Sequence, residues 1–187
     1  MHPEVDRGNL LEYLADIFNR RGTDSYLGEA VSMTEHMLQT AQNAERAGES
    51  GAMITAALFH DIGHYAGEFP ENHMDLGLDN RHEVLGAAIL ENFFPEEVTE
   101  PVRWHVDAKR YLCAIDPEYF GTLSSASVRT LALQGGPLDA GQVAEFEKNI
   151  HLDSIIRLRK YDDSGKTPGV RTPGIGYYLE FARELLG

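Results

Sequence analysis

Hydrophobic residues recur three and four positions apart along most of the chain, a spacing that predicts helices rather than strands. The first such stripe runs over residues 10–18 and is expected to end near Gly22. The next segment, residues 32–48, begins with Ser32 followed three positions later by Glu35, which is the spacing of a helix capping box. The pattern therefore predicts two amphipathic helices, each turning one apolar face toward a core.

The same periodicity continues to the end of the chain. Further helices are expected over residues 51–61, 81–94, 101–112, 124–134, 152–163 and 174–186. Segment 51–61 is almost entirely apolar and should be central, Asp79 or Asn80 can cap the helix that follows, and Pro101 suits a first helical turn. No strand-like alternation of useful length is found. The prediction is an all-α globule of about eight helices, forming a single domain over residues 1–187.

Charge and composition narrow the classes of partner. The chain carries 30 acidic residues against 16 Lys and Arg, a net charge of -14, which argues against nucleic acid and anionic membranes as partners. Cys113 is the only cysteine, so no intrachain disulfide is possible. No signal-peptide pattern and no run of 18 apolar residues occurs, so we expect a cytoplasmic protein. An anionic ligand would need a local positive site.

Ionisable side chains appear where the most apolar helix should end. The stretch AALFHDIGH, residues 56–64, places His60, Asp61 and His64 at the edge of an apolar segment. Because an unpaired buried charge costs several kcal/mol, these groups need partners, either one another or a metal ion.

Similar residues begin or end other predicted helices, and together they form a metal-ligand set. Its members are His36, His60, Asp61, His82, His105 and Asp162. Imidazole and carboxylate suit Fe, Mn, Zn or Ni, and six donors exceed what one tetrahedral ion uses. We therefore expect two ions bridged by Asp61, with open positions on the ion that has fewer protein ligands.

The order His, His-Asp, Asp resembles the HD-domain superfamily of all-α metal-dependent enzymes, over roughly residues 26–166. His82 and His105, with YLGE at 26–29, HDIGH at 60–64 and LRKYDDSGK at 158–166, resemble a narrower group within it. These are the mixed-valent diiron oxygenases that cleave the carbon–phosphorus bond of 1-hydroxy-2-aminoethylphosphonates. The resemblance implies two iron ions, Fe(II) and Fe(III), with O₂ as co-substrate.

The resemblance also implies a role for each matching residue. One iron would be held by His36, His60, Asp61 and Asp162, and the other by Asp61, His82 and His105. Asp162 is preferred to Asp163 from its place after LRKY. Tyr26, beside Glu29, matches a tyrosine that occupies the open iron position until substrate displaces it.

Further matches concern the substrate. His64 and Lys109 match groups that contact it, Glu29 offers charge to its nitrogen, and the phosphonate pocket corresponds to Ser127, Thr130 and Arg159. Lys109 lies one helical turn after His105, and Ser127 and Thr130 share a helix face. These residues would form the local anion site that an acidic protein requires.

The substrate implied is the organophosphonate (R)-1-hydroxy-2-(trimethylammonio)ethylphosphonate, converted to glycine betaine and phosphate. A quaternary ammonium is best held by aromatic faces and a carboxylate, and candidates for the aromatic faces are Tyr26, Tyr65, Phe69 and Tyr161. Two longer predicted loops, 65–78 and 163–173, are expected to be lids or rims.

Several alternatives remain open at this point. The same reaction on the primary amine would give glycine and phosphate. An HD-type phosphohydrolase, a metal-free binding module and an inositol-type oxygenase are further hypotheses, and the oligomeric state is undetermined. Metal identity separates the oxygenase from the hydrolase, because a hydrolase should work with redox-inert ions.

Overall fold

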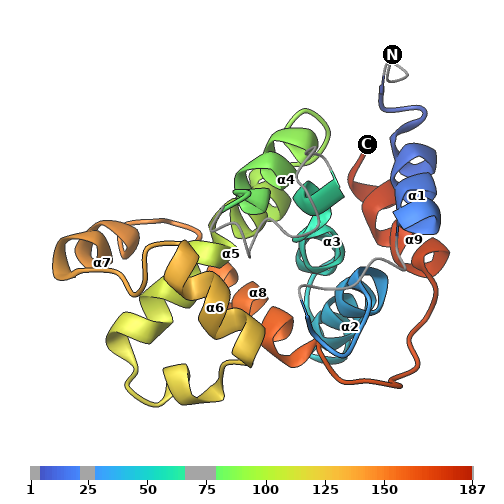
Figure 1. Cartoon of the computed structure of the whole chain (residues 1–187). Coiled ribbons are helices and arrows are strands. Elements are labelled where there is room, and N and C mark those ends of the chain that lie inside the picture. Colours follow the sequence, from blue (N-terminus) through green and yellow to red (C-terminus); the bar gives the residue numbers. More distant parts are fainter. Residues whose placement is uncertain (1–4, 22–27, 66–78, 187) are drawn as a thin grey trace.

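A computed structural model describes residues 5–21, 28–65 and 79–186 (Figure 1). Within these ranges the chain forms nine α-helices and two short 3₁₀ helices. Their order is α1 (Leu10–Arg21), α2 (Met33–Arg46), α3 (Gly51–Phe59), η1 (Ile62–Tyr65), α4 (His82–Leu90), α5 (Glu96–Ile115), η2 (Tyr119–Thr122), α6 (Ser125–Leu133), α7 (Ala140–Phe146), α8 (Leu152–Ser164) and α9 (Ile175–Leu185). No extended strand occurs among these residues, so the all-α prediction is confirmed.

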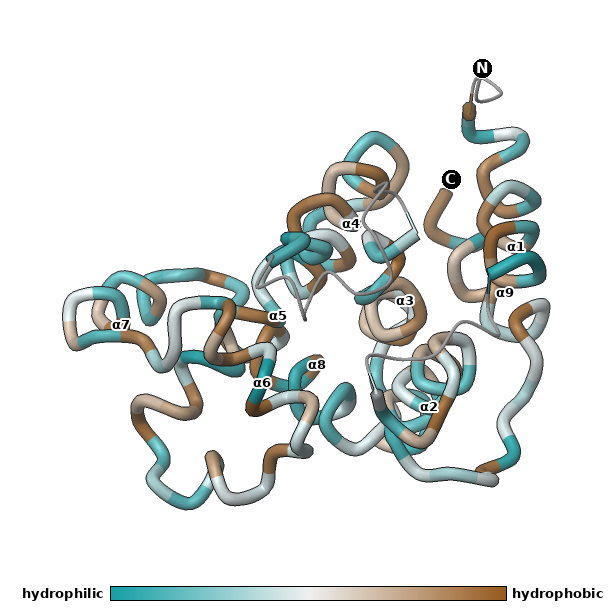
Figure 2. Tube along the Cα trace, in the orientation of Figure 1, coloured by the Kyte–Doolittle hydropathy of each residue, from teal (hydrophilic) through white to brown (hydrophobic). Residues whose placement is uncertain are grey.

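Helix α3 lies at the centre, as its apolar sequence predicts. It begins after Ser50, whose side chain accepts a hydrogen bond from the Met53 backbone N–H, and it contacts α2, α5, α8 and α9. Figure 2 shows hydrophobic residues around α3, whereas α1 alternates between hydrophobic and hydrophilic turns. A helix that is apolar on all sides is stable only when other helices cover every face.

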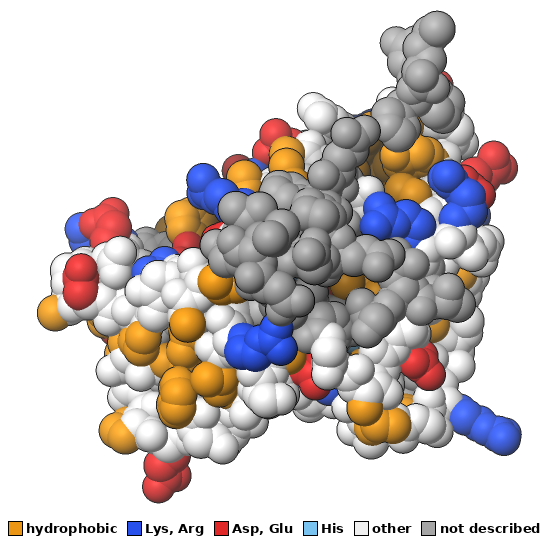
Figure 3. Space-filling model, viewed as in Figure 1, with side chains coloured by type: hydrophobic (Ala, Val, Ile, Leu, Met, Phe, Trp, Pro, Cys, Tyr) orange, Lys and Arg blue, Asp and Glu red, His pale blue; other side chains and the backbone are white. Residues whose placement is uncertain are grey.

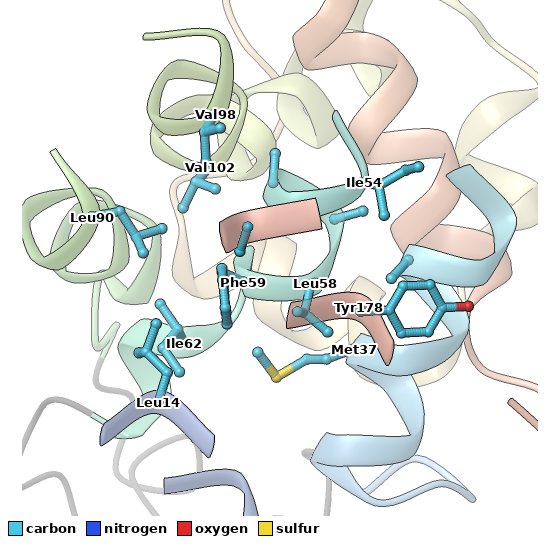
Figure 4. Packing of buried hydrophobic residues seen from close by; sticks show 14 of the residues in the cluster. Leu14, Met37, Ile54, Leu58, Phe59, Ile62, Leu90, Val98, Val102 and Tyr178 are labelled. Atoms are coloured by element: carbon cyan, nitrogen blue, oxygen red, sulfur yellow. The ribbon is translucent and has the colours of Figure 1, made fainter. Parts of the chain in front are cut away.

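The main core forms around α3. In Figure 4, Leu58 and Phe59 of α3 lie between Met37 of α2 and Val102 of α5, with Tyr178 of α9 at one side. All five of these side chains are buried, and they come from segments far apart in the sequence. Burying a side chain of this size contributes roughly 1.5–3 kcal/mol, so the core fixes how the helices surround α3.

A second, smaller core lies between α5, α7 and α8. It contains Ala108, Tyr111, Leu112, Leu138, Phe146 and Ile155. Helix α5 belongs to both cores, and it packs against α3, α4 and α8. Because α2 also contacts α3 and α8, five helices meet around one region, and these are the helices that carry the predicted ligands.

Helices α7 and α5 differ from what the sequence pattern predicted. Helix α7 was not predicted, because it has seven residues and buries only Phe146, too little to show a helical period. Helix α5 begins at Glu96 after Pro95, so Pro101 lies inside the helix instead of in its first turn. The helix continues through Pro101, although a proline cannot donate the backbone hydrogen bond of that position.

The described surface is mixed in character. On the face shown in Figure 3, hydrophobic side chains gather over the part that contains α6 and η2, and charged side chains lie mainly toward the edges. Among the described residues, no helix combines the length and the apolar character needed to cross a bilayer.

Candidate metal centre and anion pocket

Each histidine of the predicted ligand set is anchored through its Nδ1 atom. The acceptors are the Gly165 carbonyl for His36 (3.0 Å), the Ala57 carbonyl for His60 (2.9 Å), the Asn80 Oδ1 for His82 (3.1 Å) and the Val102 carbonyl for His105 (2.8 Å). Carbonyl oxygens only accept hydrogen bonds, so in a neutral ring the proton must be on Nδ1. The Nε2 atom of each neutral ring is then left with a lone pair that can bind a metal.

These Nε2 atoms face one another in pairs inside the protein. The His36 and His60 Nε2 atoms are 3.0 Å apart, and the His82 and His105 Nε2 atoms are 3.1 Å apart. All four rings are buried. Two lone pairs at this distance repel unless a proton or a metal cation lies between or beside them, so the donor arrangement fits metal binding.

Asp61 lies between the two pairs. Its Oδ2 is 3.5 Å from His36 Nε2 and 3.4 Å from His60 Nε2, while its Oδ1 is 3.2 Å from His82 Nε2 and 3.5 Å from His105 Nε2. The structure thus contains two buried groups able to hold a metal ion, and Asp61 is a member of both. This geometry is the one expected of a bridging carboxylate.

Asp162 adds a second carboxylate on the His36 side. Its Oδ1 is 3.3 Å from His36 Nε2, and its Oδ2 is 2.7 Å from Arg159 Nη1. By contrast, the neighbouring Asp163 carboxylate binds Arg159 and accepts a hydrogen bond from the Tyr119 hydroxyl. The preference for Asp162 over Asp163 is consistent with these contacts.

Local structure explains how the histidines reach this region. The predicted capping box is present on α2, where Ser32 accepts from the Glu35 backbone and Glu35 accepts from the Ser32 backbone. His36 follows in the next position and points its ring at α3 and α8. Packing is tight beside it, since a Cβ on Gly165 would lie 2.5 Å from Thr40 Oγ1.

The start of α4 differs from the prediction of an Asp79 or Asn80 cap. The residue before the helix is Arg81, which has a left-handed backbone (φ 46°). Asp79 Oδ1 accepts from the Arg81 backbone N–H, and Asn80 Oδ1 accepts from the His82 backbone N–H at 3.4 Å. Asn80 therefore accepts a hydrogen bond from a backbone N–H of the first helical turn, although it lies one residue before the capping position.

The carboxylates and the rings shift one another's ionisation. Burial alone would raise the pKa of Asp61, but His60 and the surrounding rings hold it well below its ordinary value. Burial would likewise lower the pKa of His36, yet hydrogen bonds and charge from Asp162 and Asp61 raise it. Burial dominates at His60 and lowers its pKa to about 4. Ionised carboxylates beside neutral imidazoles are the states that bind metal.

A cavity opens beside the second histidine pair. Its empty volume of about 380 Å³ includes the open solvent at its mouth. The described residues lining it are Glu29, Asp61, His64, His82, His105, Val106, Lys109, Ala126, Ser127, Thr130, Gln134, Arg159, Asp162 and Lys166. The structure therefore brings the predicted polar substrate contacts to one cavity, namely Glu29, His64, Lys109, Ser127, Thr130 and Arg159.

Lys109 is the most deeply buried lysine of this cavity. Its side chain donates a hydrogen bond from Nζ to Thr130 Oγ1 at 2.8 Å. Burial lowers the pKa of Lys109 to about 7, and the neighbouring Arg159 and Lys166 cations add to this effect. An anion entering the cavity would restore the charged form.

Lys166 was missed by sequence reasoning. Its Nζ donates to Ser127 Oγ at 3.1 Å and lies 3.4 Å from Asp162 Oδ1 and 4.0 Å from Glu29 Oε1. The available signal was the four-residue spacing from Asp162, but the intervening DSG resembled a loop beyond the helix. Lys166 adds a third cation to the pocket that Lys109 and Arg159 were expected to form.

Arg159 lines the cavity, but its hydrogen bonds go to protein groups. Its Nη1 contacts Asp162 Oδ2, its Nη2 contacts Asp163, and its Nε donates to the Tyr119 hydroxyl at 3.1 Å. Burial would lower the pKa of Arg159, but the two carboxylates raise it, so the guanidinium stays charged. Its contacts indicate a second role, that of holding the Asp162 carboxylate in place.

The expected aromatic contacts to the ammonium group are not found among the described residues. Tyr65 packs against Phe18 with Arg21 over its ring, and the Tyr161 hydroxyl donates to Glu49 at 2.8 Å. Neither lines the cavity. Tyr26 and Phe69, like most of the 65–78 loop, lie outside the described residues.

Comparison of the sequence with known protein families gives a match over the segment that contains most of this site. Residues 33–139 match the HD domain, a range that includes both buried histidine pairs. The chain belongs to the HD-domain family. The predicted family and its all-α fold are therefore confirmed.

Two relatives of this HD-domain chain are named as phosphonate dioxygenases. It is 49% identical over 183 residues, 98% of this chain and 93% of the relative, to [1-hydroxy-2-(trimethylamino)ethyl]phosphonate dioxygenase (glycine-betaine-forming) of Leisingera caerulea. It is 43% identical to hydroxymethylphosphonate dioxygenase of Gimesia maris over 82% of this chain and 77% of the relative. An uncharacterised protein of Acanthamoeba polyphaga mimivirus is 32% identical over 92% of this chain and 80% of its own length.

Proposed function

We propose that this HD-domain protein is a diiron, O₂-dependent oxygenase that cleaves the carbon–phosphorus bond of (R)-1-hydroxy-2-(trimethylammonio)ethylphosphonate to glycine betaine and phosphate. The observation that carries the proposal is Asp61, whose two oxygens face separate histidine pairs at the wall of a cation-lined cavity. The relative named for the glycine-betaine-forming reaction covers nearly the whole chain. Its product name supports the trimethylammonio substrate over the primary amine.

The residues divide into two proposed ligand sets. His36, His60 and Asp162 would share one ion with Asp61, and His82 and His105 would share the other with it. Imidazole and carboxylate donors with positions left open are typical of non-haem iron sites. Iron supplies the redox chemistry and activation of O₂ that no amino-acid side chain offers.

The remaining cavity residues would bind and orient the substrate. Lys109 and Lys166, with the Thr130 and Ser127 hydroxyls that they contact, would hold the phosphonate oxygens. Glu29 lines the same cavity and supplies the negative charge that a substrate ammonium requires. Opposite charges at two places in one small cavity would set the direction in which a zwitterionic phosphonate enters.

Metal analysis tests the diiron part of the proposal. The purified protein should hold about two irons per chain, and partial reduction should give a coupled mixed-valent magnetic resonance signal. Asp61→Asn keeps the shape but removes the anionic bridge, so it should lose iron from both groups and abolish turnover. Full activity with a single zinc ion would contradict the oxygenase proposal and support a hydrolase.

Substrate comparison tests the choice of nitrogen group. The ratio kcat/KM should be highest for the trimethylammonio compound, lower for the primary amine and lowest for hydroxymethylphosphonate, which has no nitrogen. Glu29→Gln should reduce kcat/KM for the two charged amines and leave hydroxymethylphosphonate nearly unchanged. A preference of the wild type for hydroxymethylphosphonate would contradict the proposed substrate, although the reaction class would stand.

A further inference from the structure

Asn80 contacts two histidines that have different proposed roles. Its Oδ1 accepts a hydrogen bond from His82 Nδ1 at 3.1 Å, and its Nδ2 donates to His64 Nδ1 at 2.8 Å. The Asn80 side chain is buried, and the two imidazole rings stack with centroids 4.0 Å apart and planes 15° apart. One amide is thus the shared partner of both rings.

The orientation of this amide is determined by a third contact. The backbone N–H of His82 points at Asn80 Oδ1 at 3.4 Å, and a backbone N–H can only donate. The atom facing His82 must therefore be the carbonyl oxygen, and the NH₂ group must face His64.

Opposite tautomers of the two neutral rings follow from this orientation. His82 donates through Nδ1, so its Nε2 lone pair faces Asp61 and His105. His64 accepts at Nδ1, so its proton is on Nε2, which points toward Asp61 Oδ1 at 3.9 Å and into the cavity. A ring with a protonated Nε2 cannot bind a metal through that atom, but it can donate to an anion.

We propose that Asn80 is a positioning residue that sets His82 as a metal ligand and His64 as a hydrogen-bond donor to the anionic substrate. The two roles rest on the proposed function, whereas the two tautomers rest only on the contacts of Asn80. The proposal explains why two histidines of one site, with stacked rings, would serve different purposes. In sequence, His64 is as close to the HD pair as any ligand, and residue type alone does not separate it from them.

Ring-nitrogen magnetic resonance measures the tautomers without turnover. The full-length protein, labelled with ¹⁵N in its histidine rings, would be loaded with zinc, which is diamagnetic. We expect His64 to carry its proton on Nε2 and His82 to carry its proton on Nδ1. A wild-type spectrum with His64 protonated on Nδ1 alone would overturn the proposal, whatever the enzyme's activity.

Two substitutions separate the functions of the amide. Asn80→Asp keeps an acceptor for His82 but removes the donor to His64, so His64 Nδ1 should become protonated, with or without a proton on Nε2. His82 should be unchanged, and zinc affinity should stay within about threefold. Asn80→Leu removes both contacts, so both rings should change and zinc affinity should fall about 10–100-fold.

Binding of methylphosphonate and a matched control complete the test. The affinity for methylphosphonate should fall at least tenfold in Asn80→Leu relative to the wild type, at zinc concentrations that saturate both proteins. Asn92→Asp makes the same chemical change at an exposed position after α4 and should alter neither tautomers nor affinities. Unchanged tautomers in a folded Asn80→Leu protein would overturn the positioning role. Because no oxidation is measured, failure here is distinct from failure of the oxygenase proposal.

Discussion

At the scale of single residues, the chemistry depends on what each candidate metal ligand contacts through the atom that does not face the metal site. The rings of His36, His60 and His105 donate to main-chain carbonyls, and the carboxylate of Asp162 is held by Arg159. These partners fix protons and orientations before any ion is bound, which is the usual function of groups behind a metal ligand.

Lys109 should make anion binding depend on pH. Its pKa is lowered to about 7, so its positive charge is present below pH 7 and is lost as the pH rises through that value. Lys109→Met should weaken binding of methylphosphonate by about 1.5–3 kcal/mol at pH 6, and by less at pH 9. Calorimetry in buffers of different ionisation enthalpy should show proton uptake on binding above pH 7 in the wild type.

Lys109→Met is also the control for this measurement. Methylphosphonate itself ionises in this pH range, and its ionisation affects the variant and the wild type equally. A Kd difference between wild type and Lys109→Met that stays constant from pH 6 to 9 would show that Lys109 does not titrate in this range.

Arg159 should differ from Lys109 in its effect on metal binding. Arg159→Gln leaves the buried Asp162 with weaker charge compensation, so protons compete better with metal for that carboxylate. We expect iron affinity to fall about tenfold or more, whereas Lys109→Met should retain its iron. Chelator competition measures both. Loss of methylphosphonate binding with unchanged iron affinity in Arg159→Gln would assign Arg159 to the anion instead.

At the scale of elements, the close approach of η1 to α4 determines the geometry of the second histidine pair. A Cβ on Gly63 would lie 1.9 Å from the His82 carbonyl oxygen and 2.7 Å from the Gly86 backbone nitrogen. Both neighbours are main-chain atoms, so they cannot move aside as a side chain can. Only glycine at this position allows η1 and α4 to lie this close.

Gly63→Ala should therefore separate the two elements. We expect a loss of about 1–3 kcal/mol in the free energy of unfolding from overpacking, with a lower metal affinity because His82 is displaced. Gly176→Ala, in α9, is the matched control and should be neutral or slightly stabilising, because the added Cβ would meet no atom beyond the neighbouring backbone of its own helix within 4 Å. Urea unfolding measures both. Equal midpoints for the two variants would contradict the close packing.

At the scale of the whole molecule, the helices enclose a buried cluster of ionisable groups. Its six members are His36, His60, Asp61, His82, His105 and Asp162, all of them buried. The Nε2 atoms of its four histidines, which come from four different segments of the chain, face one another in pairs. A bound metal would therefore connect these segments of the chain through their side chains.

Removing metal should lower the melting temperature. A ligand that binds only the folded state stabilises it by RT ln(1 + [L]/Kd), about 2.7 kcal/mol at 100 times Kd. The metal-free chain should melt below the loaded one, and its Tm should rise with each increase in added Fe(II) under anaerobic conditions. The same titration of Asp61→Asn should give a much smaller rise. A Tm independent of metal would contradict the site.

The sequence by itself determined the elements and the residue types of the site. The apolar run before His60 predicts a buried central helix, and the capping box at Ser32 predicts the start of α2, because these signals are local. The single ionisable pair His60-Asp61 at the end of such a helix indicates a ligand. The all-α fold and the candidate metal-ligand set can be predicted from these local patterns.

Tertiary structure alone decided which atoms meet. Lys166, two residues beyond the end of α8, lines the cavity, and the Arg159 guanidinium contacts Asp162 and Asp163 as well as lining it. Asn80 lies between His64 and His82 because η1 and α4 pack closely across a stretch of chain between them. Residue type and spacing do not specify which ring nitrogen carries a proton; that depends on partners brought together by packing across the fold.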